Sequence, residues 1–139
     1  MTWIVDTSVA VKWAVAEEGS ELAAPFLGGD VVAPDLLRSE LANALWKKVR
    51  RNEIGALQAV AGFAAIEAAL TFLPTDRLAA RALDIALTIA HPVYDCVYLA
   101  LAESTGIRIL TADRKLIVNC QGTPFGDWLV SLEAASRAG

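Results

Sequence analysis

The sequence predicts an α/β domain with a mostly parallel sheet that is covered by helices on both faces. Two observations predict this fold class: short apolar runs rich in β-forming residues recur along the chain, and longer segments with helical periodicity separate them. The chain has 139 residues, of which 55% are hydrophobic and 20% are charged. That composition suits one domain over residues 1–139 with a sizeable core, and it excludes general disorder.

Four short runs are the predicted strands: 2–6, 31–34, 71–74 and 107–111. Strands that alternate with helices favour parallel pairing through crossover connections. In such sheets, ligands bind beyond the carboxyl ends of the strands. Polar residues directly after these runs are therefore the first candidates for a functional site.

Seven segments are predicted helices: one from Thr7 or Ser8, then 20–27, 36–52, 56–70, 76–90, 93–105 and a short one after Asp113. Asp35 and Thr75 are the predicted N-caps of the helices that follow them. Because Thr7 or Ser8 can cap the first helix, Asp6 is not needed there as a cap. The tail after the last helix gives no clear prediction.

The alanine-rich stretch 55–73 has the length and polarity of a short membrane span. It carries one charge, Glu67, which would lie well inside the span at a high energetic cost. A helix over 56–70 that is buried in the fold or packed against a partner chain is the better interpretation. We also expect no secretory signal, because the first residues lack a positive segment and Asp6 interrupts the apolar run.

The net charge of −4 disfavours uniform electrostatic binding of nucleic acid, so such a role needs a local basic patch. Two clusters could supply it: Lys47, Lys48, Arg50 and Arg51, and then Arg114 and Lys115. The first cluster could equally be a solvated helix end that complements the helix dipole. Cys96 and Cys120 share no metal-type spacing and suggest no disulfide framework, which favours a reducing, intracellular setting; Cys96 is interpreted as a core thiol.

Four acids occupy positions that suit a shared site. Asp6 ends the first predicted strand and Asp113 follows the fourth, while Glu40 and Asp95 lie on helices beside apolar surface. Each alone has a plainer explanation, such as a cap or a dipole partner. In a parallel sheet, however, all four can converge at one edge. Four carboxylates raise one another's pKa and need cations, and Mg²⁺ or Mn²⁺ prefer such oxygen ligands.

Other catalytic patterns fit the sequence less well. It contains no G-x-x-x-x-G-K-[ST], G-x-G-x-x-G or G-x-S-x-G motif. Phosphatases that use an aspartate nucleophile place a second Asp two residues after the first, where this chain has Ser8. His91 is the only histidine, and beside Pro92 it is interpreted as a structural residue at a helix junction.

Three motifs together resemble a known family. VDTSV, SELANAL and YDCVYLALAESTGIRILTAD are similar in order and spacing to the PIN domain, and specifically to the toxin nucleases of the bacterial and archaeal VapBC toxin–antitoxin systems. The resemblance runs from Ile4 to about Leu116. It implies a PIN-like three-layer α/β/α fold with a mostly parallel central sheet of four to five strands.

The resemblance also implies an activity and a set of site residues. The activity is that of a metal-dependent endoribonuclease, in which Mg²⁺ or Mn²⁺ activates a water that hydrolyses RNA phosphodiesters. The implied catalytic and metal-binding residues are Asp6, Glu40, Asp95 and Asp113. The implied supporting residues are Ser8, Asn43 and Thr111.

The implied partners are an RNA substrate and a VapB-type antitoxin. The family pattern is a cytoplasmic homodimer that forms a heterotetramer or larger assembly with the antitoxin and has no membrane role. Two other functions stay open on the sequence alone. One is a PIN-fold binding module without turnover. The other is a phosphoacceptor domain, which fits less well because the third predicted strand ends at Leu73-Pro74 and not on an aspartate.

Overall fold

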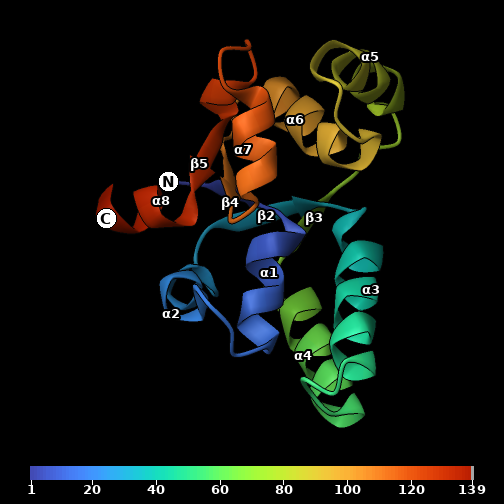
Figure 1. Ribbon diagram of the computed structural model, residues 1–139, viewed down its shortest axis with the longest axis vertical. Coiled ribbons are helices and arrows are strands. Elements are labelled where there is room, and N and C mark those ends of the chain that lie inside the picture. Colours follow the sequence, from blue (N-terminus) through green and yellow to red (C-terminus); the bar gives the residue numbers. More distant parts are fainter. Residues whose placement is uncertain (139) are drawn as a thin grey trace.

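Five parallel strands form the central sheet of the computed structural model, which describes residues 1–138. The strands are β1 (Trp3–Val5), β2 (Val31–Pro34), β3 (Thr71–Leu73), β4 (Ile109–Thr111) and β5 (Leu129–Ser131). Their order across the sheet is β3-β2-β1-β4-β5 (Figure 1). The predicted fold class is confirmed, and β5 is the strand that the sequence analysis missed.

Eight α-helices connect and flank the strands within the described chain. They are α1 (Thr7–Ala14), α2 (Ser20–Ala23), α3 (Leu37–Arg50), α4 (Ala56–Ala69), α5 (Ala79–Ile89), α6 (Val93–Thr105), α7 (Arg114–Cys120) and α8 (Leu132–Ala138). Short 3₁₀ turns at Ala24–Phe26 and Gly126–Trp128 complete the described elements. The predicted helix over 20–27 is thus split, because Pro25 cannot continue the α-helical hydrogen bonding.

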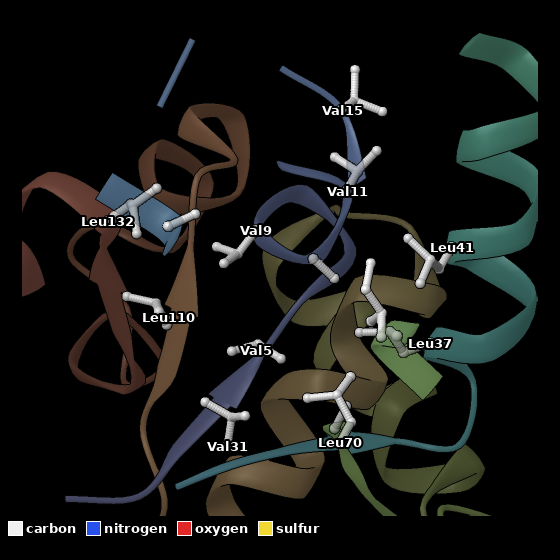
Figure 2. Close-up of a cluster of buried hydrophobic side chains, with 14 of the residues drawn as sticks. Val5, Val9, Val11, Val15, Val31, Leu37, Leu41, Leu70, Leu110 and Leu132 are labelled. Atoms are coloured by element: carbon white, nitrogen blue, oxygen red, sulfur yellow. The ribbon is translucent and has the colours of Figure 1, made fainter. Parts of the chain in front are cut away.

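Alternation along the strands divides the core into two halves. Val5 and Leu110 face the cluster covered by α1, α2, α3, α4 and α8, which Figure 2 shows around Val5. Ile4 and Ile109 face the opposite cluster, which α5, α6 and α7 cover (Figure 1). These four strand side chains have no solvent exposure. Burial on both sheet faces is what makes the strands read as continuous apolar runs.

The central strand determines where the candidate site lies. β1 pairs with β2 on one side and with β4 on the other, and both pairs are parallel. Asp6 follows β1 directly, and Asp113 follows β4 by two residues. Both acids therefore lie beyond the carboxyl ends of adjacent strands, as the sequence predicted.

Two predicted helix caps are wrong. Thr75 Oγ1 donates to Asp35 Oδ1 over 2.5 Å, so these two side chains satisfy each other across the ends of β2 and β3. Helices α3 and α5 begin later, after Leu36 and Leu78, and neither has a side-chain cap. A contact between residues 40 positions apart has replaced two local caps.

Helix α4 lies on the outside of the fold, so the prediction of a helix buried in the fold is also wrong. Ile66 is its one buried residue, whereas Leu57 and Val60 are 87% and 69% exposed. The helix packs on α1 and α3 through its other face (Figure 1). Within residues 1–138, no single helix is both long and apolar enough to cross a membrane. The bent pair α5 and α6 passes that test only when the two are taken together.

The contact between α1 and α4 is tight at Gly62. A Cβ at this position would lie 2.8 Å from Ala14 Cβ, on the helix that carries Thr7 and Ser8. We expect Gly62→Ala to lower the free energy of unfolding by about 1–2 kcal/mol, because the clash outweighs the better helix propensity of alanine. Urea denaturation measures the loss. The double variant Ala14→Gly/Gly62→Ala should recover part of it, and a stabilised single variant would contradict the close packing.

Candidate active site

Asp6 is held by three donors at the end of β1. Its Oδ1 accepts hydrogen bonds from Ser8 Oγ at 2.5 Å and from the backbone N–H of Val9 at 3.2 Å. Its Oδ2 accepts a short hydrogen bond from Thr111 Oγ1. The bond to Val9 makes Asp6 the N-cap of α1, which corrects the expectation that Thr7 or Ser8 would serve. Asp6 is the residue with extended backbone before the helix, and only from there can a side chain reach back to this N–H.

The two hydroxyls that hold Asp6 also tie β1 to the segment after β4. Ser8 Oγ accepts from the N–H of Ala112 at 2.9 Å, and Thr111 Oγ1 accepts from the N–H of Asp113 at 3.0 Å. Each hydroxyl therefore donates to Asp6 and accepts from the backbone. Thr111 is fully buried, so it has few alternative orientations. The network therefore fixes Asp6 and Asp113 relative to each other. Asp113 in turn caps α7 by accepting from the N–H of Leu116.

Glu40 extends the site toward the helices on both sheet faces. Its Oε1 accepts from Tyr98 Oη at 2.7 Å and from Thr7 Oγ1 at 3.2 Å. Tyr98 belongs to α6, whereas Glu40 belongs to α3 and Thr7 to α1. One carboxylate oxygen thus joins helices from both layers of the domain.

Asp95 is paired with the only histidine. His91 Nε2 lies 2.6 Å from Asp95 Oδ2, and His91 Nδ1 lies 2.8 Å from the side-chain nitrogen of Asn119. The His91 side chain is 3% exposed, and that of Asp95 is 33% exposed. His91 is thus more than the junction residue predicted from the sequence, and no sequence pattern indicated its contact with Asn119. The spacing of four between His91 and Asp95 was the one available sign of their contact.

Electrostatics places three of the acids in one neighbourhood. Burial raises the pKa of Asp6 to about 6; hydrogen bonds lower it in part, and the charge of Asp95 adds to the rise. Burial also raises the pKa of Glu40, and the charge of Asp95 again contributes. Asp95 therefore acts on both acids, although the three lie on β1's end, α3 and α6. Asp113 joins them through the hydroxyl network of Ser8 and Thr111.

Within residues 1–138, no three Asp, Glu, His or Cys side chains are gathered closely enough to hold a metal ion. Each of the four candidate acids is instead engaged with a hydrogen-bond partner from the protein. The donor types nevertheless suit a hard divalent cation, because all four are carboxylates. A cation would also favour the charged form of Asp6, which burial disfavours. Asn43 is exposed on α3, three residues beyond Glu40.

A groove of about 300 Å³ opens beside Ser8, between α1 and α3. It is lined by Ser8, Val11, Lys12, Glu17, Ala44, Lys47, Lys48, Arg51 and Ala112. Glu17 bridges two of these lysines, at 3.7 Å from Lys12 and 3.2 Å from Lys48. We refer to this surface as the basic groove.

The predicted basic cluster at the end of α3 is divided between two surfaces. Lys47, Lys48 and Arg51 line the basic groove. Arg50 lies instead over the ring of Trp46, 5.1 Å from the ring centre. Trp46 is 54% exposed. Arg114, predicted as a phosphate contact, lies 3.9 Å from Glu18. Position on the helix therefore separates residues that the sequence had grouped together.

The raised pKa of Asp6 predicts that the metal-free protein loses stability as the pH rises. The fold favours the protonated carboxyl, so the free energy of unfolding falls between about pH 4 and pH 6, by on the order of 3 kcal/mol in total. The raised pKa of Glu40 acts in the same direction. Urea titrations in EDTA at pH 4.5 and pH 7 should show Asp6→Asn less sensitive to pH than the wild type. Asp76→Asn, at an exposed acid, is the control, and equal slopes in all three proteins would refute the assignment.

Comparisons with known proteins identify the family. Residues 3–120 match the family model described as PIN domain. The chain is 35% identical over 124 residues to Ribonuclease VapC3 from Pyrobaculum aerophilum. This match covers 84% of this chain and 92% of that protein. The crystal structure of PAE2754 from the same organism matches with a TM-score of 0.75 at 21% identity, over 99% of this chain and 88% of that one, and so shows the shared fold. The chain therefore belongs to the PIN domain family, among its VapC-type members.

Proposed function

We propose that this protein is a metal-dependent endoribonuclease that acts as the toxin of a type II toxin–antitoxin system. The observation that carries the proposal is the group of Asp6, Glu40 and Asp95, which act on one another's charge from the end of β1, from α3 and from α6. The similarity of this chain to a protein named Ribonuclease VapC3 supports RNA hydrolysis as the reaction. Acids with raised pKa values at the carboxyl edge of a parallel sheet support this edge as the location of the active site.

Mg²⁺ or Mn²⁺ would be held by the carboxylates of Asp6, Glu40, Asp95 and Asp113. When bound, such an ion lowers the pKa of a water and offsets the charge that develops on a phosphodiester during hydrolysis. Asp95 or Asp113 would accept the proton of the attacking water as general base. Ser8 and Thr111 fix the direction of the Asp6 carboxylate, and Tyr98 does the same for Glu40.

RNA is the substrate class that the basic groove supports. The groove shares Ser8 with the Asp6 network, so it begins where the acids lie. Its cations could follow the phosphates of a single-stranded or looped segment while the acids and metal act on one linkage. This local charge answers the difficulty posed by the net charge of −4.

A protein partner is proposed for the outer face of α3 and α4. An apolar groove of about 360 Å³ separates the two helices and is lined by Ala42, Leu45, Trp46, Val49, Ala56, Ala59, Val60 and Phe63. Exposed apolar surface of this kind supports a homodimer and an assembly with a VapB-type antitoxin. The prediction that the helix over 56–70 packs against a partner chain is therefore kept as part of this proposal.

A binding module without turnover is the second candidate. The observation that favours it is that each candidate acid already accepts a hydrogen bond, and no three are gathered for a metal in the described residues. On this hypothesis, the acids would bind a partner's basic side chain. Cleavage assays on purified protein decide between the two functions.

The nuclease proposal predicts RNA cleavage that needs Mg²⁺ or Mn²⁺ and stops with EDTA. Asp6→Asn and Asp95→Asn should each lower the rate by about 100-fold or more, because each removes a charge on which metal and proton transfer depend. Gel assays on single-stranded RNA measure the rate, and Asp76→Asn is the matched acid-to-amide control. Cleavage that survives in both site variants would show a contaminating nuclease.

The basic groove predicts opposite effects from residues of opposite charge. In EDTA, Lys47→Gln and Arg51→Gln should weaken binding of labelled single-stranded RNA and reduce the slope of log K against log salt by roughly 0.7 each. Glu17→Gln should strengthen binding, because it removes the negative charge that pairs with both Lys12 and Lys48 in the groove. Fluorescence anisotropy at several salt concentrations measures both quantities. Arg50→Gln, outside the groove, is the control. An equal effect of this variant would contradict the proposal that RNA binds along the basic groove.

A further inference from the structure

His91 links α6 to α7 through two hydrogen bonds. It is 6% exposed and lies just before α6, where its ring is placed between Asp95 of that helix and Asn119 of α7. It is the only histidine in the sequence. Neither the proposed hydrolysis nor the RNA path uses it.

The partners determine which ring nitrogen carries the proton. The side-chain nitrogen of Asn119 is a donor only, so at 2.8 Å it requires His91 Nδ1 to accept. The neutral ring then carries its proton on Nε2, which donates to Asp95 Oδ2 at 2.6 Å. Asn119 thus orients His91, and His91 directs one chosen oxygen of Asp95.

We propose that His91 is a positioning residue that fixes the Asp95 carboxylate for the metal, with Asn119 holding the ring. This inference rests on the proposed function. Occupying Oδ2 fixes the rotation of the carboxylate and leaves Oδ1 to a cation. In the described residues Oδ1 accepts no side-chain hydrogen bond.

The exposure of the two side chains favours this role over simple satisfaction of a buried acid. The Asp95 side chain is 33% exposed, so water could solvate it without a histidine. Its charge also reaches Asp6 and Glu40, so its orientation matters to the whole acid group. Partners that orient metal ligands typically change metal affinity about 10–100-fold when they are removed.

Two amide variants separate positioning from packing. Glutamine places its NH₂ near the position of His91 Nε2, whereas asparagine reaches only as far as Nδ1. We expect His91→Gln to keep the Mn²⁺ affinity of the wild type and His91→Asn to weaken it about 10–100-fold. Electron paramagnetic resonance of free Mn²⁺ measures the affinity without any activity assay. Thermal unfolding of both metal-free variants measures how much packing each has lost.

A second route disturbs the same contact without altering His91. Asn119→Leu should weaken Mn²⁺ binding and shift the ¹⁵N signals of the single labelled histidine, whereas Gln121→Leu, an exposed control beside the same helix, should do neither. This variant also serves if His91→Asn does not fold.

The outcomes distinguish this inference from the function on which it rests. Weakened Mn²⁺ binding in His91→Asn and Asn119→Leu, but not in His91→Gln, supports the positioning role. Wild-type affinity in all three variants, or losses that simply follow thermal stability, overturns it alone. A wild-type protein that binds no Mn²⁺ overturns the proposed function, and the positioning role with it.

Discussion

The burial of one carboxylate, that of Asp6, is the constraint on which the site depends. Asp6 is 7% exposed at the end of the central strand, where a charge is costly unless it is hydrogen-bonded. Its three donors come from α1 and from the end of β4, so satisfying the charge also fastens the first helix to the neighbouring strand. The central joint of the fold and the centre of the candidate site are therefore the same set of hydrogen bonds. For this reason, a change at Ser8 or Thr111 would affect packing and chemistry together.

Glu40 and Asp95 lie near the same edge of the sheet because both helical layers reach it. Glu40 comes from α3 on one face, and Asp95 comes from α6 on the other. Tyr98 of α6 crosses to Glu40, and its ring is buried on the way. Since parallel strands end together, helices that begin beyond those ends place their first turns around one space. Glu40 and Asp95 are far apart in sequence, yet each lies within reach of the other's charge, and only the resemblance of their motifs to the PIN domain indicated this.

Much of the fold, but less of the site, could be predicted from the sequence. Four strands and the main helices follow from apolar runs and periodicity, which are local properties. The contacts of Thr75 with Asp35 and of His91 with Asn119 join distant residues, and no local pattern encodes them. The cap of α1 was misassigned because Asp, Ser and Thr are all favoured caps, and only the backbone conformation selects Asp6. The short β5 and the exposure of α4 depend on neighbours, which composition does not specify.

Hydrogen bonds and cations solve different parts of the problem that Asp6 presents. Neutral donors fix where its carboxylate points, yet they lower its pKa by less than burial raises it. Positive charge would offset the remainder, but of the lysines in the basic groove beside Ser8, two are already engaged by Glu17. In the proposed function, a bound divalent cation would supply that charge. The basic groove, in turn, offers more positive charge than Glu17 can neutralise. One surface is suited to a divalent metal and the adjoining one to phosphates, which is the pairing that a phosphodiester substrate requires.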